Sequence, residues 1–65
     1  MERKLTLKAW RYNAGLTQTD LATAIGKNKD TISRWEKGET QPTAMDIQAI
    51  ESVLGINWSN DILLP

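Results

Sequence analysis

The chain has 65 residues, and its eight basic and eight acidic side chains give a formal net charge of zero. At this length it forms one domain, spanning residues 1–65, with little room for an enclosed pocket. The absence of Cys and His excludes disulfides, thiolate metal sites and histidine chemistry, and no apolar run is long enough to cross a membrane. We therefore expect a soluble, cytoplasmic domain that has no cofactor, no metal site and no membrane partner.

The first predicted helix begins after Thr6, a residue suited to cap a helix N-terminus, and is ended by Gly15. Its larger side chains recur at i, i+3, i+4 and i+7, which is the spacing of a single helical face. That face consists of Leu7, Trp10, Arg11 and Ala14.

The second predicted helix begins at the cap Thr17 and is ended by Gly26, a residue suited to a left-handed stop. Asp20 lies three residues after the cap, the position that completes a capping box. Because Asp stands where Glu is usual, its bond back to Thr17 is left open. The buried side of this helix is expected to consist of Leu21, Ala22 and Ile25.

After a short gap, Asn28 is placed to cap a third helix over residues 29–37, which Gly38 ends. Ile32 and Trp35 lie three positions apart and are expected to point inward. The outer faces then carry polar and mostly charged side chains, namely Lys29, Asp30, Ser33, Arg34 and Lys37.

Two further helices complete the chain. Thr43 caps the fourth, which Gly55 ends, and Asn57 caps a short fifth. The fourth helix presents an apolar face of Ile47, Ile50, Val53 and Leu54, and the fifth carries Trp58, Ile62 and Leu63. Five short helices with tight connections, and no competing strand pattern, predict an all-α domain.

Charge is unevenly distributed along the chain. Residues 1–38 contain all eight bases and four acids, whereas residues 39–65 contain four acids and no base. This split suggests one face for a polyanion, the alternative being chance clustering of solvated charge. The two helices within about residues 17–37, joined by a turn of a few residues, fit a helix-turn-helix, whose second helix fits the major groove of DNA.

The segment LTQTDLATAIGKNKDTISRWEKGETQPT, from Leu16 to Thr43, resembles the lambda-repressor/Cro-like, or XRE-type, helix-turn-helix family. The resemblance continues through LGINWSNDILL and so covers nearly the whole chain. It implies a five-helix lambda-repressor-like fold and sequence-specific binding of double-stranded DNA. It further implies a nucleoid-associated transcriptional regulator, expected to be a repressor, that binds a near-palindromic operator as a homodimer.

The family pattern also implies roles for individual positions. Base contacts are expected from Lys29, Asp30, Ser33 and Arg34, and backbone contacts are expected from Gln18, Asn28, Lys37 and Thr40. A structural ion pair is expected between Arg11 and Glu36. The apolar residues at the end of the chain suggest a dimer surface around Trp58, Ile62 and Leu63.

Some of these positions have a second interpretation. Gln18 could be an ordinary exposed first-turn residue, and Lys29 and Arg34 could be merely solvated. Asp30 is favoured in the first turn of a helix whether or not DNA is present, yet in the groove it could accept from a cytosine amino group.

Two residues depart from the family pattern. Lys27 stands where an apolar residue is usual in the turn, so packing there could be looser or replaced by a phosphate contact. Glu51 stands where a small residue usually packs, so it must turn to solvent or find a partner.

The rival hypothesis is a protein-interaction module on the same fold, such as an antitoxin or a co-regulator. The acidic C-terminal half and the loop GETQP, which carries Glu39 and no base, favour it. An enzyme is not expected, because the chain has no His or Cys, no Gly-rich phosphate loop and no carboxylate pair in an apolar pocket.

Overall fold

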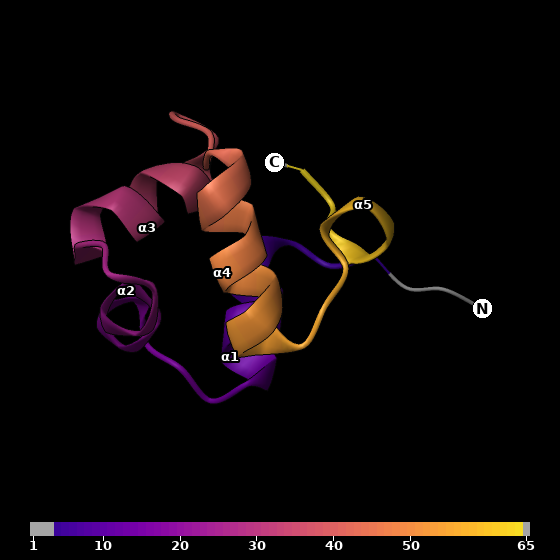
Figure 1. The fold of residues 1–65 in the computed structure, drawn as a ribbon, viewed down its shortest axis with the longest axis horizontal. Helices are drawn as coiled ribbons and strands as arrows, with labels where there is room; N and C mark the ends of the chain where they lie inside the picture. The colour runs from indigo at the N-terminus through magenta and orange to yellow at the C-terminus, as the bar shows by residue number, and fades with distance from the viewer. Residues whose placement is uncertain (1–3, 65) are drawn as a thin grey trace.

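Residues 4–64 are described by a computed structural model, shown as a ribbon in Figure 1. Its helices are α1 (Leu7–Asn13), α2 (Gln18–Ile25), α3 (Lys29–Lys37), α4 (Ala44–Leu54) and α5 (Trp58–Asp61). α2 packs against both α3 and α4, and α4 crosses in front of α1 in the view of Figure 1. The prediction of an all-α fold with five helices is confirmed for this part of the chain. None of these helices has the length and apolarity that crossing a bilayer requires.

Side-chain caps fix where the helices begin. The hydroxyl of Thr6 accepts from the backbone N–H three residues on, and the amide oxygen of Asn28 does the same at the start of α3. At α2, Asp20 donates its backbone N–H to Thr17 Oγ1 at 3.0 Å, and Thr17 donates its own to Asp20 Oδ2 at 2.9 Å. The capping box left open by the sequence therefore forms with Asp in place of Glu.

Gly26 ends α2 and Gly38 ends α3. Gly26 and Gly38 have φ values of +74° and +77°, in the left-handed region that costs a glycine little because it has no Cβ. The following N–H then bonds back into the helix, from Lys27 to the carbonyl of Ala22 at 2.8 Å and from Glu39 to that of Arg34 at 2.9 Å. This closed geometry sets the direction in which α3 leaves α2.

The core gathers apolar side chains from every helix except α5. Ile32 has no exposed surface and Trp35 is 6% exposed, so the inward face predicted for α3 is confirmed. Val53, on the apolar face predicted for the fourth helix, is 38% exposed. The buried apolar residues are Leu7, Leu21, Ala22, Ile32, Trp35, Ile50, Ile56 and Ile62.

The C-terminal segment corrects two predictions. α5 ends at Asp61, and Ile62 adopts extended backbone that forms a parallel bridge with Leu5. The N–H of Leu5 donates to Asp61 O at 3.0 Å, and the N–H of Leu63 donates to Leu5 O at 2.9 Å. Ile62 and Leu63 therefore lie outside the fifth helix. Ile62 is also only 6% exposed, so its assignment to a dimer surface is wrong: the bridge turns it into the core.

Candidate nucleic-acid interface

α3 has one face in the core and one in solvent. Ile32 and Trp35 anchor the buried side, while Ser33 between them is half-buried. Within residues 4–64, no salt bridge engages the charged side chains of the outer face. These side chains are exposed and open to a ligand, and they are Lys29, Asp30, Arg34 and Lys37.

A buried ion pair joins α1 to α3. Arg11 Nε donates to Glu36 Oε2 at 2.7 Å, and Arg11 Nη2 donates to Glu36 Oε1 at 3.2 Å. The two side chains are only 5% and 4% exposed. The hydrogen bond to Glu36 raises the pKa of Arg11 above its ordinary value, although burial works against that rise. The guanidinium therefore stays charged and makes the strong, two-pronged contact that suits a carboxylate.

The Arg11 guanidinium has two further neighbours. Its Nη1 donates to the backbone oxygen of Leu16 at 2.9 Å, just before the cap of α2. The ring of Tyr12 lies against it, with 4.7 Å between the ring centroid and Arg11 Cζ. Arg11 thereby holds the α1–α2 connection as well as α3.

Gln18, the first residue of α2, is tied into the same group. Its side-chain Nε2 donates to Glu36 Oε1 at 3.1 Å, and the residue is half-buried. This contact bridges α2 and α3, so Gln18 is not an ordinary exposed first-turn residue. A contact from Gln18 to a DNA phosphate stays a prediction.

The other predicted backbone contacts lie at the two ends of α3. Asn28 uses its amide oxygen to accept from the N–H and the hydroxyl of Thr31, both at 2.9 Å, and its amide nitrogen has no hydrogen-bond acceptor within residues 4–64. Lys37 lies in the last turn, Thr40 lies in the following loop, and both are exposed. A helix of nine residues is about 13 Å long. The predicted base-contacting residues therefore lie between two groups of predicted phosphate contacts.

The two residues that depart from the family pattern have partners that the sequence did not indicate. Lys27 Nζ lies 3.2 Å from Asp46 Oδ1, so the turn is linked to α4 by an ion pair in place of apolar packing. Burial would raise the pKa of Asp46, but hydrogen bonds from the Thr43 backbone and side chain and from Lys27 hold it below its ordinary value. Glu51 Oε2 accepts from the backbone N–H of Trp58 at 2.8 Å and so supports the start of α5.

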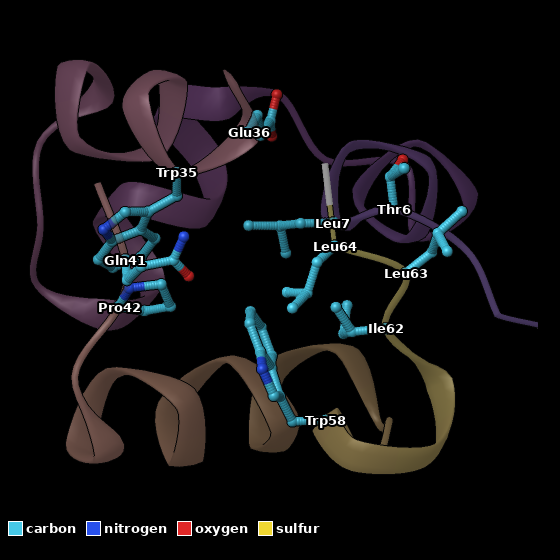
Figure 2. Close-up of a pocket in the computed structure, with 10 residues that line it drawn as sticks. All are labelled: Thr6, Leu7, Trp35, Glu36, Gln41, Pro42, Trp58, Ile62, Leu63 and Leu64. Carbon is cyan, nitrogen blue, oxygen red and sulfur yellow. The ribbon is translucent and has the colours of Figure 1, made fainter. Parts of the chain in front are cut away.

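An apolar hollow lies between α1, α3, the loop before α4 and the C-terminal segment (Figure 2). Its lining includes all three residues predicted at a dimer surface, Trp58, the buried Ile62 and Leu63, together with the neighbouring Leu64. Leu63 and Leu64 are 51% and 61% exposed, whereas Trp58 is half-buried against the core. Among residues 4–64, no three His, Cys, Asp or Glu side chains are grouped so as to hold a metal ion.

The helix-turn-helix family matches residues 7–59. The type II methyltransferase M1.ScrFI of Lactococcus lactis subsp. cremoris is 42% identical over 52 residues, which cover 75% of this chain and 13% of the methyltransferase. The type II methyltransferase M.SsoII of Shigella sonnei is 42% identical over 48 residues, covering 69% of this chain and 13% of that protein. The putative multi-protein-binding factor 1 of Yarrowia lipolytica is 38% identical over 56 residues, covering 85% of this chain and 37% of that protein. No solved structure matches the chain significantly.

The similarity is confined to a part of each relative, since the chain spans between 13% and 37% of their lengths. The family match, in contrast, runs from the start of α1 to residue 59 and so takes in the whole of α1 to α4 and the first part of α5. The five-helix fold, the geometry of the turn between α2 and α3 and the family match all indicate a helix-turn-helix domain. The chain belongs to the lambda-repressor-like, or XRE-type, helix-turn-helix family of DNA-binding domains.

Proposed function

We propose that the chain binds double-stranded DNA sequence-specifically, as a transcriptional regulator acting at the nucleoid, with α3 in the major groove. The outward face of α3 carries the argument. Lys29, Arg34 and Lys37 are exposed on it without a salt-bridge partner in residues 4–64, and the opposite face is anchored in the core. A helix fits the major groove, where each base pair presents its own pattern of donors and acceptors.

The length and the hydrogen-bonding groups of each side chain on α3 determine which part of the DNA it contacts. Arg34, near the middle of the outer face, is long enough to form a two-pronged contact with guanine. Ser33 is small and half-buried, so it lets the helix approach the groove floor. Asp30 accepts from a cytosine amino group, and Lys29 donates to a guanine acceptor. Phosphates on either side are contacted from Asn28 and Gln18 at one end and from Lys37 and Thr40 at the other.

The test is selection of bound sites from a random duplex pool, followed by two substitutions. Lys37→Ala removes a phosphate contact, so it should weaken binding to all sequences alike and lower the slope of log K against log salt by about 0.9. Arg34→Ala should relax the preference at one base position by about 1–3 kcal/mol. Gln48→Ala, at an exposed position of α4, is the control and should change neither quantity. Unchanged affinity and unchanged site ranking in both test variants would refute the proposal.

The regulator acts as a repressor that occupies a near-palindromic operator as a homodimer, with half-sites about 34–36 Å apart. Leu63 and Leu64 support this proposal, because they are exposed apolar residues beside Trp58. Sedimentation with a duplex holding both half-sites should show two chains bound, and Leu63→Asp should reduce that to one. A single chain on the full site with the unchanged protein would exclude the dimer.

The second candidate is a protein-interaction module on the same fold. It is favoured by the exposed Leu63 and Leu64 and by a relative whose name describes a multi-protein-binding factor. Binding to random duplex DNA separates the two, because phosphate contacts make that binding fall steeply with salt. Methyltransferase activity is not carried over, since the match covers only 13% of each methyltransferase.

A further inference from the structure

The turn between α2 and α3 carries a cation that already has a partner within the fold. Lys27 Nζ lies 3.2 Å from Asp46 Oδ1 in the first turn of α4, and the two side chains are 40% and 12% exposed. We propose that Asp46 competes with DNA phosphate for Lys27, and that this competition limits how tightly the domain binds DNA of any sequence. This inference rests on the proposed function and gives a role to a cation that the predicted DNA contacts leave out.

The carboxylate of Asp46 is fixed by the cap of α4. Its Oδ2 accepts from the backbone N–H of Thr43 at 3.1 Å, and the Thr43 hydroxyl accepts from the N–H of Asp46 at 3.2 Å. One carboxylate oxygen therefore serves the capping box, and the other faces Lys27. Burial acts to raise the pKa of Asp46, but hydrogen bonds from Thr43 and Lys27 hold it below its ordinary value. The carboxylate is therefore ionised at neutral pH and attracts the ammonium group.

The backbone of Lys27 is fixed in the turn, so only its side chain can change partner. Its N–H donates to Ala22 O at 2.8 Å, and the residue lies between Gly26, which ends α2, and Asn28, which caps α3. Neighbouring Cα atoms are about 3.8 Å apart, and a lysine ammonium sits on a flexible four-carbon stem. A phosphate near the start of α3 is therefore within reach of Lys27 once the ammonium leaves Asp46.

The exposed cations of α3 have no such competitor. No salt bridge engages Lys29, Arg34 or Lys37 within residues 4–64. Each of them can neutralise a phosphate directly, whereas Lys27 must first leave a carboxylate. The start of α3 also favours anions, because the positive end of the helix dipole lies there. A released Lys27 would therefore add one phosphate contact, which strengthens binding whatever the base sequence.

Repulsion between Asp46 and the phosphates would also weaken DNA binding, and it would do so without any part for Lys27. The two explanations differ once the lysine is removed. Repulsion by Asp46 persists without Lys27, whereas competition for Lys27 disappears. A cycle of substitutions at the two positions therefore separates them, because it measures how far each change depends on the other.

The test compares the unchanged chain with Asp46→Asn, Lys27→Met and the double variant, each titrated with a random-sequence duplex over a range of salt. Asp46→Asn preserves the cap, because the amide oxygen still accepts from the Thr43 N–H, and it turns an amide nitrogen, a donor, toward Lys27. Released from its partner, Lys27 should steepen the slope of log K against log salt by about 0.9. The gain in affinity over the unchanged chain should then grow about fourfold for each fivefold dilution of salt.

Lys27→Met is the matched control. It should leave the slope unchanged, because the ammonium of the unchanged protein is on Asp46 and not on a phosphate. The double variant should have the same slope as Lys27→Met, because Asp46→Asn then has no cation to release.

Two results with Asp46→Asn would overturn the competition and leave DNA binding by α3 intact. One is an unchanged slope, and the other is an equal rise with and without Lys27, which would assign the effect to repulsion. A slope lowered by about 0.9 in Lys27→Met would also overturn it, since Lys27 would then already contact a phosphate. That measurement decides even if Asp46→Asn fails to fold. No binding of any duplex by the unchanged chain and by Lys27→Met, at any salt, would instead refute the proposed function and this inference with it.

Discussion

Replacing Arg11 by Ala is expected to remove a large part of the stability of the fold. The change deprives the Glu36 carboxylate, whose side chain is 4% exposed, of both guanidinium bonds, and it leaves the Leu16 oxygen without its donor. Removing one member of a buried pair costs about 3–5 kcal/mol. At roughly 0.05–0.15 kcal/mol per residue, a chain of this length has a total free energy of unfolding of about 3–10 kcal/mol. The free energy lost in Arg11→Ala is therefore comparable with the total free energy of unfolding.

Urea unfolding followed by tryptophan fluorescence and far-UV circular dichroism measures this loss. Lys8→Ala is the matched control, because it removes an exposed cation from the same helix and should change the free energy of unfolding by less than about 0.5 kcal/mol. A paired variant, Arg11→Met with Glu36→Met, should recover most of that loss, because no unpaired charge stays buried, but it should remain below the unchanged protein because the Leu16 oxygen and the Gln18 amide lose their partners. A loss below about 1 kcal/mol for Arg11→Ala would show that the buried pair does not carry the energy assigned to it.

Three further changes test the fold. Ile32→Ala should cost about 2–5 kcal/mol in urea unfolding, because the side chain is fully buried; a cost below 1 kcal/mol (roughly) would contradict its place in the core. Gly26→Ala should cost about 1–2 kcal/mol from backbone strain alone, because φ is +74° and the added Cβ meets no atom within 4 Å; an unchanged midpoint would contradict that conformation. Asp20 has its pKa lowered by hydrogen bonds from Thr17, and the pKa of Asp46 is also lowered. Stability from both caps is therefore complete above about pH 4, the pKa of an unfolded Asp, and is lost as the pH falls through the lower folded values. As the pH is lowered from about 4, the urea midpoint should fall less in a variant with Asp20→Asn and Asp46→Asn than in the unchanged protein. Equal falls in the two proteins would show that these two carboxylates do not cause the loss of stability.

The parts of the fold that the sequence predicted well depend on neighbouring residues. A cap such as Thr17 finds its partner three residues on, and a glycine stop such as Gly26 redirects the chain within one residue. The burial of Ile32 follows from helical spacing once the helix is known. These interactions repeat in any chain with the same local pattern, so the sequence alone is sufficient to predict where the helices begin and end and which face is buried.

The parts that were missed depend on contacts between distant segments. Leu5 pairs with Ile62 across almost the whole chain, and that bridge, not any local stop signal, ends α5 early and buries Ile62. Lys27 stood out only as a departure from the family pattern, because its partner Asp46 lies in another helix. Local periodicity carries no information about such pairs.

The candidate site shows the same division. The exposure of Arg34 and Lys37 follows from their positions opposite Ile32 and Trp35, and the structure agrees. The family pattern paired Arg11 with Glu36, but no spacing in the sequence indicated that Gln18 would share the same carboxylate. The contacts of these residues with DNA stay predictions until a bound site is selected.

A net charge of zero does not argue against DNA binding by this fold. Two carboxylates, Glu36 and Asp46, are occupied by Arg11 and Lys27 and contribute little field outside the molecule. The outer face of α3 is left with three cations and Asp30. Of the four acids in the C-terminal half, Glu39 follows α3 directly and Asp46 is paired with Lys27. α5, which carries Asp61, lies toward the opposite end of the longest axis from α2 and α3 (Figure 1), and that axis measures 34 Å. Since charges are screened beyond about 8 Å at physiological ionic strength, a phosphate near α3 responds to the local cations and not to the charge of the whole chain.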